Sequence, residues 1–364
     1  MKIQDLLLAI ELEVPNSLQE PFDNCGLQIG SPLKDVKKGL VCIDVTPQVI
    51  NEAEKKGCDL IISHHPVLFK GLKKICGQNA VERVVADAIK KEIAIISLHT
   101  NLDNIHHGVN EKLGEVLGLK NLKILQPQKG LLRKLVTFCP GSHATQIREA
   151  LFEAGAGQIG EYDSCSFNLE GTGTFRAGKS ANPFVGKPEE MHYEPEVRIE
   201  TIVPSYRLPV VLEAMFKSHP YEEVAYDIYP LENNFNQAGS GMIGEFDVPL
   251  PEIDFLDHIK KQLKIPCLRH TGLLDIDIKK VAFCGGSGAF LLEKAVEKGA
   301  QAFITGDIKF HQFFEAEGRI LLIDAGHYET EQVTKELLYE IVNKKFSKFA
   351  LLISEVNTNP VNYF

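Results

Sequence analysis

Two segments of the chain share one order of apolar and polar runs, residues 39–63 and residues 280–305. In each, an apolar run that indicates a strand is followed by a helix pattern closing at glycine, and then by a second apolar run. Because a β-α-β unit requires parallel strands and a right-handed crossover, each segment predicts an α/β lobe. The predicted strands are 39–46, 58–63, 280–284 and 300–305, and the predicted helices are 47–56 and 289–298.

A different pattern separates the two lobes. Its strands and helices follow the order β-α-β-β-α-β, which is typical of a ferredoxin-like α+β domain. Ser142 is the expected N-cap of its first helix, and the polar, Gly- and Pro-containing residues 176–195 predict a loop. Residues 232–244 are expected to return the chain to the main body. The predicted strands of this segment are 133–140, 163–174, 197–203 and 224–229, and its predicted helices are 142–154 and 206–218. The chain is therefore expected to form a first lobe 1–127, an insert 128–235 and a second lobe 236–364.

Three apolar runs end in histidine, and two of these add a carboxylate four residues further on. In open α/β sheets, ligands collect beyond the carboxyl ends of the strands. Imidazole and carboxylate are ligands of first-row transition metals. Similarity between all β-α-β units would explain the repeated elements, but it would not explain matched His/acid pairs. We therefore predict one metal centre between the lobes, holding two ions. The groups concerned are His64-His65, His99 with Asp103, and His327 with Glu331.

The spacing of these residues suggests individual roles. Neighbouring residues on a regular strand point to opposite faces, but Pro66 takes the chain out of the ladder, so His64 and His65 can each serve one ion. If a helix follows His327, then Glu331 faces the same side and can bridge two ions. The alternatives are a surface His-His pair in a loop and a capped helix whose His and Glu face solvent.

His99 has a different predicted role from Asp103. Asp103 is assigned as a ligand, and with the other four groups it already suits two ions that share one carboxylate. His99 is therefore expected to lie outside the ligand set, as a group that orients a ligand or carries a proton.

The remaining candidates are expected to be structural. His106-His107 predicts a loop, and His311 is expected to face the cleft without binding metal. Residues 219–223 are expected to pack within the insert, and the alternative is that they meet the cleft or a partner subunit. The glycine-rich turn at 284–288 either presents N–H groups to an anion or allows close strand–helix packing. It matches neither dinucleotide-binding nor P-loop spacing, so no such cofactor is predicted. Four histidines have no acidic or histidine partner at ligand spacing, and they are His143, His192, His258 and His270.

Composition narrows the class of protein. A chain of 364 residues is longer than a single hydrophobic core usually supports, so more than one domain is expected. The content of 44% apolar and 24% charged residues is typical of globular proteins. A net charge of −10 without a basic run argues against nucleic acid as a partner. No apolar stretch of about 18 residues occurs, so no membrane partner is expected. Eight cysteines without a CxxC motif favour a reducing cytoplasm and argue against a cysteine-ligated zinc site.

Taken together, seven segments resemble the Nif-three-like family, whose bacterial members are often labelled GTP cyclohydrolase I type 2 homologs. The resemblance implies a two-lobed α/β protein with a dinuclear metal site, and assembly as a homohexamer. It also implies a PII/CutA-like insert, and residues 219–223 resemble a segment of that insert. It implies the same five ligands, namely His64, His65, Asp103, His327 and Glu331. The segments are 23–27, 44–47, 61–66, 100–103, 284–288, 305–307 and 324–327.

Three functions follow as hypotheses. The first is a metal-dependent hydrolase that uses a metal-bridging hydroxide on a cyclic amide or nucleotide-like small molecule, with His99 carrying a proton. The alternative is a non-catalytic metal-binding scaffold or regulator, whose insert senses a metabolite or recruits a partner. An open coordination position favours the first. A third hypothesis is a nucleotide-binding regulator acting through the insert. Zinc is the first expectation for the two divalent ions, and iron, manganese, cobalt and nickel suit the same ligands.

Overall fold

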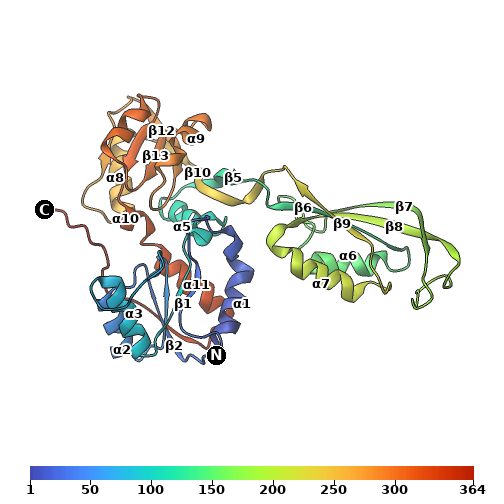
Figure 1. Cartoon of the computed structure of the whole chain (residues 1–364). Coiled ribbons are helices and arrows are strands. Elements are labelled where there is room, and N and C mark those ends of the chain that lie inside the picture. The colour runs from blue at the N-terminus through green and yellow to red at the C-terminus, as the bar shows by residue number, and fades with distance from the viewer. The chain divides into compact units, whose positions relative to one another are not determined.

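The computed structural model describes residues 1–364, which divide into two compact units (Figure 1). One unit combines Met1–Pro127 with Gln237–Phe364, and the other is Gln128–Asn236. The first unit contains two sheets, one in each predicted lobe, so the lobes form one compact body rather than two. None of the helices combines the length and the apolar character needed to cross a membrane.

The first lobe is a five-stranded sheet with helices on both faces. Its elements are β1 (Gly26–Ile29), β2 (Lys38–Cys42), β3 (Leu60–Ser63), β4 (Ala94–Ser97), β15 (Ala350–Ile353), α1 (Ile3–Glu13), η1 (Asn16–Leu18), α2 (Pro47–Lys55), α3 (Ala80–Lys90), α4 (Thr100–Asn104) and α11 (Thr334–Lys345). The strand order is β1-β4-β3-β2-β15, and all pairs are parallel except β1 with β4. Helices α1 and α11 pack on one face and α2 and α3 on the other, which explains why the strands are uninterrupted apolar runs.

The second lobe is a six-stranded sheet. Its elements are β5 (Lys120–Gln128), β10 (Phe235–Pro251), β11 (Arg269–His270), β12 (Asp277–Phe283), β13 (Ala302–Thr305), β14 (Leu321–Asp324), α5 (Val109–Val116), α8 (Glu252–Leu263), η3 (Ala289–Leu291), α9 (Leu292–Glu297), η4 (Phe310–Ala316) and α10 (His327–Glu331). The order is β11-β14-β13-β12-β10-β5, with β12, β13 and β14 parallel. Helices α5 and α8 pack on one face, and η3, α9 and η4 on the other.

The repeated β-α-β unit is confirmed in both lobes. Strand β2 is parallel to β3 across α2, and β12 is parallel to β13 across η3 and α9. Helix α2 begins where expected, because the Thr46 hydroxyl accepts a hydrogen bond from the Val49 N–H and Pro47 occupies the first turn. Two local details differ from the simplest expectation. The first turn of the second helix is 3₁₀ at Ala289–Leu291, and residues 232–244, which return the chain to the main body, do so as the start of strand β10 from Phe235.

The insert is a four-stranded antiparallel sheet with two helices on one face (Figure 1). Its elements are β6 (Leu132–Pro140), α6 (Ala144–Glu153), β7 (Ser166–Arg176), β8 (Met191–Pro204), η2 (Ser205–Arg207), α7 (Leu208–Ser218) and β9 (Tyr226–Leu231). The strand order β7-β8-β6-β9, with α6 and α7 as the two connections, has the ferredoxin-like order of elements.

Two predictions within the insert are wrong. The expected loop at 176–195 is shorter, because the β7–β8 ladder continues to the pair Arg176–Met191. Pro195 is tolerated in β8 because the pairing of β8 with β6 ends at Glu196, so only the β7 side of this position is paired. Ser142 does not cap α6 either, since its hydroxyl hydrogen-bonds the neighbouring His143 Nδ1 at 2.9 Å.

Candidate metal centre

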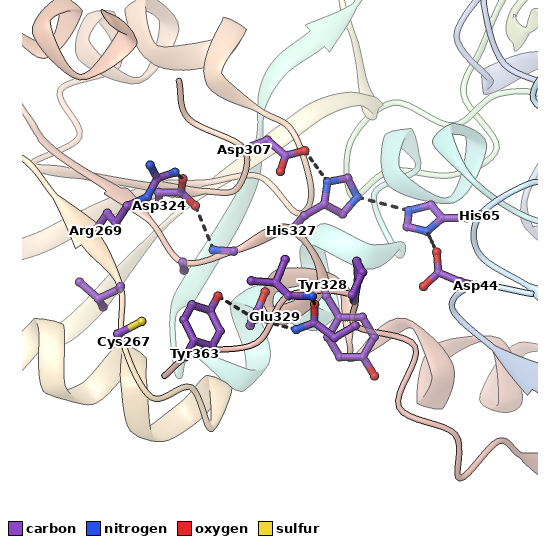
Figure 2. Close-up of a pocket in the computed structure, with 16 residues that line it drawn as sticks. Asp44, His65, Cys267, Arg269, Asp307, Asp324, His327, Tyr328, Glu329 and Tyr363 are labelled. Carbon is purple, nitrogen blue, oxygen red and sulfur yellow. Dashed lines mark hydrogen bonds and ion pairs between the residues drawn. The ribbon is translucent and has the colours of Figure 1, made fainter. Parts of the chain in front are cut away.

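The five predicted ligand residues come together within the unit formed by the two lobes. His64 and His65 directly follow β3, and Asp103 lies on α4, just after β4. His327 and Glu331 are the first and last residues of α10, which follows β14. Each group therefore stands beyond the carboxyl end of a parallel strand, where open α/β sheets bind ligands. Figure 2 shows His65 and His327 pointing toward one another from opposite sides.

The five side chains form two groups that share Glu331. In the first group, His64 Nε2 lies 3.7 Å from Asp103 Oδ1 and 3.7 Å from Glu331 Oε1. In the second, Glu331 Oε2 lies 3.1 Å from both His65 Nε2 and His327 Nε2, and the two nitrogens are 3.3 Å apart. Within each group the ligand atoms all lie within 4.8 Å of one another. One carboxylate thus offers one oxygen to each group.

Unsatisfied buried atoms indicate that these groups suit a cation. His64 Nε2, Asp103 Oδ1 and Glu331 Oε2 are buried and have no hydrogen-bond partner. Leaving such atoms without a partner is costly, so a native site of this kind calls for an explanation. Imidazole nitrogens and carboxylate oxygens converging at these distances are the donor set of a divalent transition-metal ion. The residues therefore fit a metal.

The charges at the centre are strongly coupled. Burial raises the pKa of Asp103 to about 7, and the nearby Glu331 adds to this effect while His64 opposes it. Burial also disfavours the charged form of Glu331, but His64, His327 and His65 outweigh it, so the pKa of Glu331 lies well below its usual value. Burial lowers the pKa of the two histidines of the second group, yet their carboxylate neighbours dominate and raise it to about 10 for His65 and about 9 for His327.

In His64, His65 and His327, the Nδ1 atom of the ring contacts an oxygen atom of the protein. His64 Nδ1 lies 2.8 Å from the Leu98 carbonyl oxygen, so it donates. His65 Nδ1 and His327 Nδ1 each lie 2.7 Å from a carboxylate, of Asp44 and Asp307 respectively (Figure 2). These contacts place the Nδ1 proton outward and turn Nε2 toward the shared carboxylate, as in known metal sites.

Removing one outer carboxylate should weaken metal binding without removing a ligand. We expect Asp307→Ala to lower the affinity of the second group about 10- to 100-fold, because His327 loses the partner that orients its ring. Competition with a chromophoric chelator measures the dissociation constant. Asp277→Ala, which removes an exposed aspartate of the same lobe, should bind like the unchanged protein, and equal affinities for both variants would contradict the orienting role.

The glycine-rich turn at 284–288 leaves space for the Glu331 side chain and does not bind an anion. The N–H groups of Gly285, Gly286 and Gly288 donate to side chains of the protein, Asn110, Thr330 and Thr305, so they are not free for an anion. Gly286 has φ +61, and a Cβ there would lie 2.2 Å from Glu331 Oε1. A side chain at this position would displace the shared carboxylate.

This close approach gives a second prediction. We expect Gly286→Ala to lower metal affinity by at least about tenfold, because the added methyl group and Glu331 cannot occupy the same space. Metal content after dialysis measures the effect. Gly299→Ala is a matched control, because Gly299 has φ +71 but no atom within 4 Å of its Cβ position. The backbone strain is then similar, and a comparable loss of metal in both variants would show that strain rather than contact with Glu331 is responsible.

His99 lies beside the two groups, and its ring forms a hydrogen bond with an aspartate. Its ring centre is 5.3 Å from those of both His64 and His65, and its Nδ1 lies 2.8 Å from Asp23 Oδ1. Asp23 also accepts the Thr100 N–H at 3.0 Å. Burial opposes the charged form of Asp23, but the hydrogen bonds from His99 and Thr100 hold its pKa well below the usual range. His99 thus has a fixed orientation, and with His64 and His65 it forms a further group of ligand atoms that could hold an ion.

Several functional contacts were not predicted. Asp23, Asp44 and Asp307 were part of the segments that carry the family resemblance, but nothing in their spacing identified the histidine that each would contact. The surface pair His106-His107 also has an unpredicted acidic neighbour, since Glu111 lies 3.4 Å from the first ring and 2.8 Å from the second. These three residues form a further group able to hold an ion.

A cavity of about 690 Å³ opens beside His65 and His327 (Figure 2). Arg269, paired with Asp324, lies on one wall. Residues from near the C-terminal end of the chain form another wall, where Asn359 and Tyr363 donate hydrogen bonds to Glu329 at 2.9 and 3.0 Å. The Thr358 hydroxyl donates to Asp44 at 2.8 Å, so this segment also touches the acid that holds His65.

Comparisons with known proteins identify the family of the chain. The model of the family Duf34/NIF3 (NGG1p interacting factor 3) matches residues 1–360. Curated relatives called GTP cyclohydrolase 1 type 2 homolog, from Halalkalibacterium halodurans and Bacillus subtilis, are each 39% identical over 366 residues, covering 99% of this chain and 98% of the relative. A crystal structure of a Bacillus cereus protein related to NIF3 is 36% identical with a TM-score of 0.88, covering 100% of this chain and 99% of that one. The chain therefore belongs to the Duf34/NIF3 family.

Proposed function

We propose that this protein is a metal-dependent hydrolase with a dinuclear centre held by His64, His65, Asp103, His327 and Glu331. The observation that carries the proposal is the position of Glu331. Its two oxygens face two separate groups, and the unsatisfied buried atoms are His64 Nε2 and Asp103 Oδ1 in the first group and Glu331 Oε2 in the second. A single ion would leave one group of donors without a partner.

Divalent ions at these groups would supply Lewis acidity toward a carbonyl, amidine or phosphoryl oxygen and would acidify a water. The protein contributes orientation and proton transfer. Asp44 and Asp307 hold the rings of His65 and His327. His99, fixed by Asp23, presents a nitrogen toward the centre and is placed to carry a proton between water and leaving group.

The cavity beside His65 and His327 supports a small-molecule substrate. Its volume of about 690 Å³ is in the range of sites for drug-sized ligands. It meets the centre on the side of the second group, which is partly exposed, whereas His64 is fully buried. A cyclic amide or nucleotide-like ring entering here would reach the second group first.

The test combines metal analysis with a substrate panel. The purified protein is loaded with zinc, manganese or iron, its metal content is measured, and each form is tested on cyclic amides, amidines and nucleotide-like rings. We expect close to two ions per chain and hydrolysis of one substrate class, both lost together in Glu331→Gln, which removes the carboxylate shared by the two groups. Hydrolysis that survives complete removal of the metal would rule out this mechanism.

One observation favours the non-catalytic alternative. His64 and Glu331 of the first group are nearly inaccessible, with side-chain exposures of 0% and 4%. An ion there could serve to hold the lobes in place rather than to act on a substrate. Spectroscopy of the cobalt-substituted protein distinguishes the two functions, because a catalytic centre must keep an exchangeable position.

A further inference from the structure

The segment 219–223, which has no part in the metal centre, lines a cavity inside the insert. The cavity has a volume of about 660 Å³ and lies between the end of the sheet and the residues that follow β7. Its walls include four aromatic rings and three carboxylates, which are Phe138, Phe175, Phe184 and Tyr221 together with Glu196, Glu222 and Glu223. A single basic residue, Arg176, is among the lining residues.

His219 fixes the shape of this segment. The side chain is buried, with 8% exposed, and its Nε2 lies 2.9 Å from the Phe138 carbonyl oxygen while its Nδ1 accepts the Tyr221 N–H at 3.1 Å. One ring nitrogen donates and the other accepts, which is the pattern of a neutral imidazole. The Tyr221 ring is thereby held against Phe184, with the ring centres 6.2 Å apart.

Tyr221 in turn holds Glu196. The tyrosine hydroxyl donates to Glu196 Oε1 at 2.7 Å. The strand opposite makes room for this carboxylate, because a Cβ on Gly173 would lie 2.0 Å from Glu196 Oε2. A side chain at Gly173 would therefore push the carboxylate away, so the glycine and the tyrosine together define its place.

Glu196 also differs from the acids near it on β8. Glu194 pairs with His192 at 2.8 Å, and Glu200 pairs with Arg198 at 2.9 Å. Glu196 has the neutral Tyr221 hydroxyl as its partner and forms no ion pair with a basic side chain. A partly buried carboxylate beside aromatic rings, without a positive partner of its own, is complementary to a cation.

We propose that this cavity binds a protonated organic amine, with the ammonium group at Glu196 and an apolar body among the aromatic rings. Three carboxylates against one guanidinium give the lining a net negative charge, which favours a cation and repels phosphate or carboxylate ligands. Aromatic faces attract ammonium groups, and the volume suits a small ligand. The same charges disfavour a nucleotide, which would bring its phosphates against these acids.

Calorimetry on the full-length protein tests the charge requirement with benzylammonium, benzyl alcohol and benzoate as probes. The three have similar shapes and differ in charge at the same position. We expect benzylammonium to bind at least about tenfold more tightly than benzyl alcohol, because its hydrogen bond to Glu196 is charge-assisted, and benzoate to bind least. Equal affinity for the three probes, or no binding of benzylammonium, would overturn the proposal.

Variants locate the site. Glu196→Gln and Gly173→Ala should each weaken benzylammonium binding about tenfold or more. Glu170→Gln changes an exposed acid of β7, and Gly171→Ala adds a methyl group where no atom lies within 4 Å, so both should bind normally. Circular dichroism and peptide-resolved hydrogen exchange check that each insert is folded. Unchanged binding in a folded Glu196→Gln would disprove the assignment, whereas Glu331→Gln should retain binding because the metal centre is separate.

Discussion

Replacing Glu331 by glutamine is expected to abolish tight binding of both metal ions. The substitution keeps the shape of the side chain but removes its charge, and its amide nitrogen cannot act as a ligand to the second group. Removing a residue that only orients a metal ligand typically lowers metal affinity 10- to 100-fold. Glu331 is itself a ligand in both groups, so its loss should lower the affinity of each group by more than about a hundredfold. Metal content by mass spectrometry and titration calorimetry measure the loss.

Three variants separate this result from a general effect. Glu336→Gln makes the same change at an exposed position of α11 and should keep both ions. His64→Ala and His65→Ala each remove a ligand from one group, so each should keep about one ion. If Glu331→Gln binds two ions with unchanged affinity, the carboxylate is not shared. If either histidine variant loses both ions at once, the two groups do not bind independently.

The convergence of the five residues could be predicted because it depends on two local rules. Parallel strands end on one edge of a sheet, so groups that follow β3, β4 and β14 are brought to the facing edges of the two lobes. Positions four apart on a helix share a face, and α10 runs from His327 to Glu331. Neither rule brings the two sheets together, and that step was predicted from the matched His/acid pairs and the family resemblance.

Contacts that depend on packing between distant segments could not be predicted in this way. Asp44 and Asp307 each follow the end of a strand, but which histidine each one contacts depends on how the strands are placed against one another. The role of Gly286 appears only when α10 brings Glu331 within reach of that turn. Likewise, the expected loop at 176–195 contains turn-forming residues, yet cross-strand pairing extends β7 and β8 into it.

Removing the metal is expected to destabilise the edges of the lobes and leave the insert unchanged. An ion that binds only the folded state stabilises it by about 4 kcal/mol at a thousandfold excess over the dissociation constant. Without it, the buried side chain of Glu331 and the buried Oδ1 of Asp103 lose the positive charge of the divalent ion. The segments that meet at the centre come from both lobes, so local opening should become more frequent there than elsewhere.

Hydrogen exchange resolved by peptide, with and without chelator, measures this local effect. Peptides covering 60–66, 98–104 and 324–332 should exchange faster after chelation, whereas those from 128–236 should not, because that unit has its own core and contributes none of the five residues. Glu331→Gln is the control. It should already exchange quickly at the centre and should not respond to chelator, since it holds no ion to remove. A uniform response along the chain would instead indicate that the metal supports the global fold, and no response in the unchanged protein would contradict a resident ion at this centre.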